Sequence, residues 1–380
     1  MSEVLVAMSG GVDSAVAAAL LVEQGHAVTG VHCKLADVPL ADQVPGHGCC
    51  TLDDAQDARR VAQVLGIPFY VWDLSTEFRR EVQDPFAAAY AGGTTPNPCV
   101  TCNEKVKYAA LLDRAIDSGF DALATGHHAR LRRDGQMVTT PGPRTRLHRG
   151  ADTRKDQSYV LYVATQPQLD RTLLPVGELE KARVRELAVE LGLRVADKPD
   201  SYDVCFVPDG DTTRYLAERL PAAPGAIVDL DGTRLGTHEG VWRFTVGQRR
   251  GLGIDPAPAR DGGSGRPQRR FVVDVDAERA TVKVGSREAL ACRWAELGAP
   301  TWTTGSQPRG PVRVQIRAHG TTVPGRVVDE EGIVRLELDE PVHGLAIGQA
   351  AVVYDAGDGV CLGGGRVSRA DRAAGLPLAL

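Results

Sequence analysis

Short apolar runs alternate with helical segments along the first third of the chain. An apolar run at residues 4–7 leads into a helical segment that ends near residue 24, and a second apolar run follows at 26–32. The same patterns predict further strands at 68–72 and 121–125 and further helices at 52–65, 105–118 and 180–191. Alternation of this kind is typical of a doubly wound parallel sheet, whose ligands lie beyond the carboxyl ends of its strands. We therefore expect an α/β domain with a ligand site built from the segments that follow the strands.

The pattern changes after about residue 210. Helical periodicity disappears, Gly and Pro become frequent, and runs such as 312–317 alternate between apolar and polar residues with a period of two, as β-strands do. We predict three domains: an α/β catalytic domain over 1–208, a small β-rich central domain over 209–288, and an antiparallel β-barrel over 289–380.

Charge changes this picture only locally. The net charge of −5 argues against a chain that binds nucleic acid over its whole surface, but arginines gather at 130–149, 243–250 and 260–270, which indicates a polyanionic partner. No apolar segment reaches the roughly 18 residues that a membrane span needs, and the first 30 residues do not resemble a signal peptide. We expect a cytoplasmic protein with no membrane partner.

The segment Ser9-Gly-Gly-Val-Asp-Ser14 directly follows the first predicted strand. Its glycines let backbone N–H groups approach phosphate oxygens, the next helix points its N-terminus at them, and Asp13 can hold Mg²⁺ or orient the loop. The lysine of a Walker loop is missing, which argues against kinases and GTPases, and the Gly-x-Gly-x-x-Gly of a Rossmann fingerprint is not present. The segment resembles the PP-loop of ATP pyrophosphatases, which cleave ATP between its α- and β-phosphates and adenylate an oxygen.

Two cysteine segments suggest sulfur chemistry. Cys102, in the pair Cys99-x-x-Cys102, is predicted to precede a helix with two lysines, a setting that lowers a thiol pKa. Cys205 lies in a second segment, so one cysteine can carry a persulfide sulfur and the other can release it by forming a disulfide. The remaining cysteines are expected to be small buried side chains (Cys33, Cys292 and Cys361) or loop thiols without a role (Cys49 and Cys50).

Several motifs occur in a fixed order along the chain. They are Ser9–Ser14, Thr95-Pro-Asn-Pro-Cys-x-x-Cys-Asn103, Ala124-Thr-Gly-His127, Lys155-Asp-Gln-Ser-Tyr159, Val204-Cys-Phe206, Val246-Gly-Gln-Arg-Arg-Gly-Leu-Gly253, Gly348-Gln349 and Cys361-Leu-Gly-Gly-Gly365. Together they resemble the tRNA-specific 2-thiouridylase (MnmA/TrmU) family over nearly the whole chain. The resemblance implies that ATP adenylates the C2 oxygen of the wobble uridine in tRNA, after which a cysteine persulfide supplies sulfur and AMP leaves.

The resemblance also assigns residues to roles. It implies ATP binding, with Mg²⁺, by Ala7, Met8, Ser9, Gly10, Gly11, Val12, Asp13, Ser14, Cys33 and Gly126, and catalysis by Cys102, Cys205 and Asp13. Asn97, Pro98 and Cys99 would meet the target base, and His127, Lys155, Asp156, Gln157, Arg317, Ala318 and Gln349 would contact tRNA. The central domain and the barrel would grip the anticodon stem. A cysteine desulfurase or a sulfur-relay protein would be the persulfide donor.

The chain departs from the family pattern at three positions. Thr94 replaces a frequent arginine, so a cation near the site would come from elsewhere, for example from 130–149, and Cys33 replaces a methionine. Cys99 stands where many members have aspartate, so Cys99, Cys102 and Cys205 could hold a [4Fe–4S] cluster. The plainer alternative makes Cys99 a bystander, or a partner that protects Cys102 by a disulfide.

Two other functions are compatible with parts of the sequence. The first is an amidating synthetase of the same superfamily acting on a small molecule, which needs neither Cys102 nor Cys205. The second is a non-catalytic tRNA-binding or sulfur-carrier protein, which has no use for the complete loop at 9–14. We therefore favour the thiolation enzyme.

Overall fold

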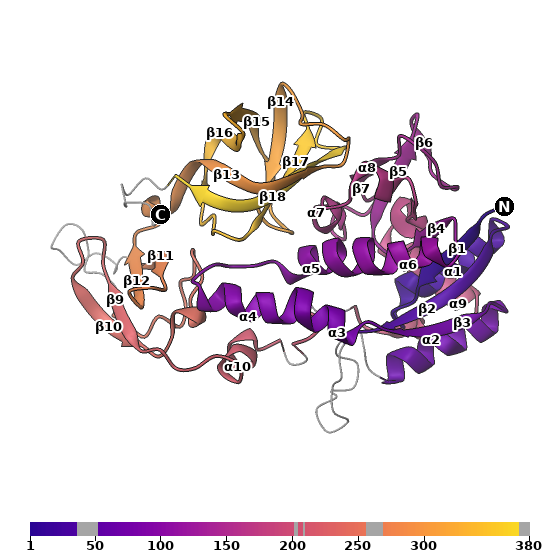
Figure 1. The fold of residues 1–380 in the computed structure, drawn as a ribbon, viewed down its shortest axis with the longest axis horizontal. Coiled ribbons are helices and arrows are strands. Elements are labelled where there is room, and N and C mark those ends of the chain that lie inside the picture. The colour runs from indigo at the N-terminus through magenta and orange to yellow at the C-terminus, as the bar shows by residue number, and fades with distance from the viewer. Residues whose placement is uncertain (36–51, 201–203, 208–209, 256–268, 372–380) are drawn as a thin grey trace.

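A five-stranded parallel sheet forms the centre of the catalytic domain. The computed structural model describes residues 1–35, 52–200, 204–207, 210–255 and 269–371 (Figure 1). The strand order is β3-β2-β1-β4-β8, and every neighbouring pair is parallel. The strands are β1 (Glu3–Ala7), β2 (Ala27–Lys34), β3 (Phe69–Asp73), β4 (Ala122–Ala124) and β8 (Thr172–Leu173). This arrangement confirms the predicted doubly wound α/β fold.

Helices and a small antiparallel sheet surround this parallel sheet. The helical elements are α1 (Val12–Glu23), α2 (Leu52–Leu65), α3 (Ser75–Phe78), η2 (Arg79–Gln83), α4 (Asp84–Ala91), α5 (Pro98–Thr101), η3 (Cys102–Leu111), α6 (Leu112–Asp117), α7 (Ser158–Leu161), α8 (Gln166–Leu169), η4 (Pro175–Glu178), α9 (Lys181–Glu190), η5 (Arg194–Asp197) and α10 (Thr212–Ala217). The small sheet has the order β6-β5-β7 and consists of β5 (Ala129–Arg133), β6 (Gln136–Met137) and β7 (Arg146–Arg149).

The predicted helix at 105–118 begins earlier than expected. Asn97 caps it, because its side-chain oxygen accepts a hydrogen bond from the Val100 backbone N–H (3.2 Å), and Pro98 occupies the first helical position, where a missing N–H costs nothing. From there α5, η3 and α6 follow one another without a break, and η3 is π-helical. Cys102 therefore lies inside a helix rather than before it, which corrects the sequence prediction.

The second half of the chain is β-structure, as predicted. The central sheet has the order β10-β9-β12-β11, and six antiparallel strands then close a barrel in the order β13-β16-β15-β14-β17-β18. The central elements are β9 (Gly225–Val228), β10 (Arg234–His238), η6 (Val241–Arg243), β11 (Phe271–Asp276), β12 (Thr281–Gly285) and η7 (Glu288–Leu290). The barrel strands are β13 (Ala291–Trp302), β14 (Pro311–Gln315), β15 (Val323–Glu330), β16 (Ile333–His343), β17 (Ala350–Asp355) and β18 (Cys361–Ala370). Cys292 and Cys361 are buried, as expected.

The barrel packs against the catalytic domain, above the segment that joins α4 to α5 (Figure 1). Tyr159 donates a hydrogen bond to the Ala350 carbonyl (2.8 Å), and Tyr354 packs into the core of the catalytic domain. Arg149 fastens the contact: its guanidinium pairs with Asp156 and with Asp358 (2.8 Å each) and lies 3.7 Å from the centre of the Tyr354 ring. The two domains therefore share a buried polar and aromatic interface.

We expect Arg149→Met to destabilise the protein by about 3 kcal/mol, because the substitution leaves the buried Asp156 carboxylate without its cation. Urea unfolding of the full chain measures the effect. Arg144→Met is the matched control. Arg144 is 74% exposed and its ion pair, at 3.8 Å to an exposed carboxylate, is long, so this substitution should shift the transition little. Equal effects of the two substitutions would contradict the assignment of Arg149 as the main polar contact.

Within the described residues, no helix is both long and apolar enough to cross a membrane.

Candidate active site

The loop between β1 and α1 is shaped to receive an anion. Gly10 has φ +80°, and a Cβ there would lie 2.4 Å from the Asp54 carbonyl oxygen, so only glycine fits. The Ser9 backbone N–H donates to Ser14 Oγ (3.2 Å), and the Ser14 hydroxyl donates to the Gly11 carbonyl (3.1 Å). The N-terminus of the 12-residue helix α1 follows the loop and favours negative charge there.

The end of β4 closes this loop from the neighbouring strand. A Cβ on Gly126 would lie 2.6 Å from the Ser14 backbone nitrogen, so Gly126 packs directly against the start of α1. Cys33 lies two residues beyond Val31, the partner of Ala7 in the sheet, and is only partly buried. Met8 and Val12 bury their side chains in the core, so only their backbone could face a nucleotide. The predicted ATP-binding residues therefore lie at one edge of the sheet.

Two lysines from distant parts of the chain face this loop. Lys181, at the start of α9, donates to both carboxylate oxygens of Asp13 (2.7 Å each). Lys198 donates to the Gly10 carbonyl (3.1 Å) and pairs with Asp54 (2.7 Å). Both lysines therefore hold the loop and its neighbours in place. The sequence analysis missed both residues, and the only available signal was a lysine at the beginning of the predicted helix 180–191.

Asp13 is held by Lys181 and by His128 and is poorly placed to be a metal ligand. His128 Nε2 lies 3.0 Å from one of its oxygens, in addition to the two contacts from Lys181. Burial acts to raise the pKa of Asp13, but the contacts from His128 and Lys181 outweigh it and lower the pKa. Of the two predicted roles for Asp13, this geometry fits orientation of the loop and does not fit coordination of Mg²⁺.

Asp200 extends the same charge network toward the Cys205 segment. Its carboxylate pairs with Lys155 (2.8 Å), Lys181 (2.9 Å) and Arg185 (3.0 Å). Burial acts to raise the pKa of Asp200, but hydrogen bonds from Lys155 and Lys181 dominate and lower it strongly. Lys181 therefore links the anion loop to the chain that leads to Cys205.

We expect Asp200→Asn to lower the thermal midpoint at pH 7 and to have progressively less effect as the pH falls below about 4. The reason is that the pKa of this carboxylate is lower in the folded than in the unfolded protein, where it is 3.8. The carboxylate therefore stabilises the folded protein at any pH above 3.8, and this stabilisation is lost as the pH falls toward the pKa of the folded state. Thermal melts of both proteins from pH 7 down to pH 3 measure the difference. Asp197→Asn, a change at an exposed residue, is the control. A difference in thermal midpoint between Asp200→Asn and the wild type that grew as the pH fell would contradict the stabilising role of the Asp200 ion pairs.

The segment with Cys99 and Cys102 is fixed by its helix. Cys102 is buried and Cys99 is partly buried, and the Asn103 side chain donates to the Cys99 carbonyl (3.0 Å) and to the Val160 carbonyl (3.1 Å). A cation reaches this helix from the barrel, because Arg366 of β18 pairs with Glu104.

The arginines at 130–149, which were expected to supply that cation and a polyanion site, mainly make internal contacts. Arg132 pairs with Glu178 (3.0 Å), Arg133 donates to the Gly142 carbonyl (2.8 Å) and Arg146 donates to the Gln166 side chain (2.8 Å). Arg130 donates to the Arg149 carbonyl (2.5 Å). Most of this cluster therefore has internal partners, and its role toward a polyanion stays a prediction.

Cys205 is positioned by its neighbour Phe206. The Phe206 ring packs edge-on against Phe78 (5.6 Å between centroids) and Phe86 (5.3 Å), and it also contacts Tyr215. Phe78 belongs to α3, which contacts the helix of Cys102, so α3 is a neighbour of both cysteine segments. Among the described residues, no three His, Cys, Asp or Glu side chains are grouped so that they could hold a metal ion. The iron–sulfur hypothesis for Cys99, Cys102 and Cys205 has no support here, and Cys49 and Cys50 lie outside the described residues.

Several predicted tRNA contacts lie where the barrel meets the catalytic domain. The Thr95 backbone N–H donates to the Ile347 carbonyl (2.8 Å), which brings Gln349 and its loop close to the segment of Asn97. The Gln315 side chain holds the carbonyls of Arg317 (2.9 Å) and Ala318 (3.0 Å).

Three other predicted tRNA contacts have internal partners. Asp156 accepts from Arg149 and Ser158, Gln157 accepts from the His128 backbone N–H (2.8 Å), and His127 bonds to Thr125 and Lys107. Their roles toward tRNA stay predictions.

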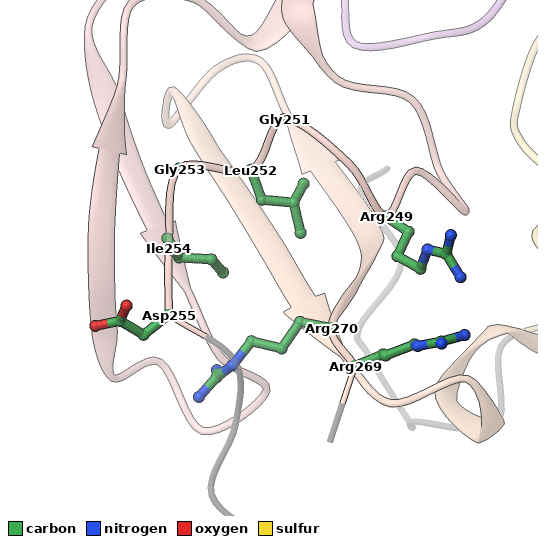
Figure 2. A pocket seen from close by; sticks show the side chains of 8 residues that line it. All are labelled: Arg249, Gly251, Leu252, Gly253, Ile254, Asp255, Arg269 and Arg270. Carbon is green, nitrogen blue, oxygen red and sulfur yellow. The ribbon is translucent and has the colours of Figure 1, made fainter. Parts of the chain in front are cut away.

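The other two arginine clusters meet in the central domain. A cavity of about 360 Å³ is lined by Arg249, Gly251, Leu252, Gly253, Ile254, Asp255, Arg269 and Arg270. Figure 2 shows the Arg249 and Arg269 side chains extending to the same side. Neither arginine forms an ion pair with another described residue. Segments separated in sequence thus form one positive surface, of the kind that phosphate groups favour.

Comparison with known proteins matches every part of this architecture. Family models described as tRNA methyl transferase HUP domain, tRNA methyl transferase PRC-barrel domain and aminomethyltransferase beta-barrel domain match residues 2–209, 213–286 and 295–367. Among solved structures, NMN synthetase from Francisella tularensis gives a TM-score of 0.32 at 19% identity over 53% of this chain and 66% of that chain. A score this low supports no conclusion about fold or function.

Curated relatives are similar over nearly their full length. The chain is 52% identical to the tRNA-specific 2-thiouridylase MnmA of Salinispora arenicola, over 96% of this chain and 98% of that protein. It is 50% identical to the protein of the same name from Acidothermus cellulolyticus, over 98% of this chain and 99% of that protein. The chain therefore belongs to the tRNA-specific 2-thiouridylase family.

Proposed function

We propose that this enzyme replaces the C2 oxygen of the wobble uridine in tRNA by sulfur, with ATP as the activating substrate. The observation that supports this best is the coexistence of an anion loop at 9–14 with two cysteine segments in one domain. An enzyme that only amidates a small molecule needs the loop and has no use for the cysteines. The reaction places the protein in the cytoplasm, where its tRNA substrate is.

ATP would be bound by residues 7–14, with Cys33 and Gly126 beside it. The close contact of Gly126 with Ser14 and the backbone N–H groups of the loop fit a phosphate chain, and Lys181 and Lys198 hold the loop in shape. The uridine C2 oxygen attacks the α-phosphorus, pyrophosphate leaves, and the adenylated uridine is ready for displacement. Mg²⁺ is expected with the nucleotide, and we assign no protein ligand to it.

Sulfur transfer would use Cys205 and Cys102 in turn. The terminal sulfur of a Cys205 persulfide attacks C2, and AMP leaves with the former C2 oxygen. The Cys102 thiolate then attacks Cys205 Sγ, the S–S bond breaks, and its electron pair stays on the sulfur bound to C2. The products are 2-thiouridine and a Cys102–Cys205 disulfide, which a thiol reductant reopens. A persulfide donor of the desulfurase or relay class reloads Cys205.

The tRNA would lie across all three domains. Asn97, Pro98 and Cys99 are proposed to meet the flipped uridine. Lys155, Arg317, Ala318 and Gln349, with Asp156, Gln157 and His127 behind them, would line the path of the anticodon arm. The positive cavity of Arg249 and Arg269 would hold backbone phosphates, so that tRNA binding weakens as salt is raised.

A substrate-dependence assay tests this proposal. Conversion of ATP to AMP and pyrophosphate should require tRNA with an unmodified wobble uridine, and tRNA that is already thiolated should not support it. Dependence on a small carboxylate substrate and ammonia, with no response to tRNA, would favour the amidating synthetase instead.

A further inference from the structure

Lys107 is held by a histidine instead of a carboxylate. Lys34, Lys105, Lys155, Lys181 and Lys198 each pair with a carboxylate. Lys107 is partly buried, forms no ion pair with any described residue, and has its Nζ 3.1 Å from Nε2 of His127. A cation removed in part from water is costly unless an anion accompanies it.

His127 can hold this ammonium group without neutralising it. Nδ1 of His127 lies 2.6 Å from the Thr125 hydroxyl, so the hydrogen-bond pattern assigns the proton to Nδ1 and leaves Nε2 to accept from Lys107. Burial, followed by the positive charge of Lys107, keeps the pKa of His127 well below its usual value. The imidazole is therefore neutral and acts as an oriented acceptor.

Lys107 connects the helical segment of Cys102 with the residues beside the anion loop. His127 directly follows Gly126, which packs on the backbone of Asp13 and Ser14, so the residue that holds the Lys107 ammonium group adjoins the residue that touches the anion loop. Lys107 also belongs to the same π-helical segment as Cys102. In a π-helix hydrogen bonds link residues five apart, which stacks positions 102 and 107 on one side. In an α-helix the same two positions would be about 140° apart.

We propose that Lys107 is a catalytic residue that binds a phosphate group at the reaction centre, and that His127 is the residue that positions it. This inference rests on the proposed function and adds a residue to its site. The phosphate could belong to the nucleotide or to the tRNA backbone. The contact of Gly126, the residue before His127, with the anion loop favours the nucleotide.

The AMP affinity, the kcat and the tRNA affinity of Lys107→Met test the inference. We expect the variant to bind AMP about tenfold or more weakly, since a hydrogen bond to a charged group is lost. At saturating ATP its kcat should fall about 100-fold, because a charge that stabilises the transition state is missing. Lys107→Arg, which keeps the charge and most of the packing, should recover a large part of both losses. His127→Gln should lower kcat with a smaller effect on the KM for ATP.

Lys283→Met is the control. Lys283 is a partly buried lysine of β12 that forms no ion pair with a described residue, and this variant should bind AMP as the wild type does.

The outcomes separate the two phosphate sources and the two proposals. Weaker AMP binding with unchanged tRNA binding supports the nucleotide, and the reverse supports a tRNA phosphate. Wild-type affinities and kcat in Lys107→Met would overturn the inference while leaving the proposed function intact. If the wild-type enzyme forms no thiolated tRNA but Lys107→Met binds AMP more weakly than the wild type, the proposed function is refuted and the phosphate site is still supported. If Lys107→Met does not fold, a normal melting curve with a lowered kcat in His127→Gln still supports the inference, and a wild-type kcat there contradicts it.

Discussion

Cys102→Ser and Cys205→Ser should each reduce tRNA thiolation by more than about 1000-fold while leaving adenylation in place. A serine oxygen cannot carry a persulfide or resolve one, yet neither cysteine belongs to the loop that would hold ATP. Pyrophosphate release on addition of tRNA should continue in both variants, and nucleoside mass spectrometry should find no 2-thiouridine.

Cys292→Ser is the control for the loss of a thiol, because Cys292 is buried inside the barrel. It should thiolate tRNA normally if it folds normally. Loss of pyrophosphate release in either Cys102→Ser or Cys205→Ser would mean that the cysteine shapes the ATP site, and the sequence of steps proposed for sulfur transfer would have to be abandoned.

Gly126→Ala should abolish ATP binding. The added methyl group would lie 2.6 Å from the Ser14 nitrogen and 2.7 Å from the Asp13 carbonyl carbon, and backbone atoms at the start of α1 cannot move aside without opening the anion loop. We expect at least a 100-fold loss of ATP affinity by calorimetry, since phosphate binding depends on the geometry of these N–H groups.

Gly298→Ala is the matched control. The nearest atom to a Cβ there is the Ser368 Cβ at 3.6 Å, an ordinary contact within the barrel. ATP affinity should be unchanged. A Gly126→Ala protein that bound ATP as tightly as this control would show that the nucleotide does not depend on the contact between Gly126 and α1.

Much of the fold could be predicted because local patterns determine it. The loop at 9–14 lies between an apolar strand and an alanine-rich helix, and both neighbours were predicted to within a few residues. The helix 52–65 was predicted with the bounds that the structure shows, since its apolar positions have helical spacing and its first turn is acidic. Alternating residues in the second half likewise indicated strands, and the barrel confirms them.

The rest depended on contacts between residues far apart in sequence. Nothing local indicates that Lys181 would reach Asp13, or that Arg366 of the barrel would pair with Glu104. The arginines at 130–149 had suggested a polyanion site because sequence cannot show that Glu178 and Gln166 would meet them. The start of the Cys102 helix was locally readable, because Asn97-Pro98 is a cap followed by a favourable first residue, and this signal was overlooked.

The central claim is best tested by one single-turnover experiment under anaerobic conditions. The protein is loaded with persulfide sulfur and freed of excess donor. It is then mixed with ATP, Mg²⁺ and tRNA that is unmodified at the wobble uridine. We expect one AMP for each 2-thiouridine formed, and afterwards a Cys102–Cys205 disulfide in the protein by mass spectrometry. Absence of 2-thiouridine, or thiolation without matching AMP, would contradict it.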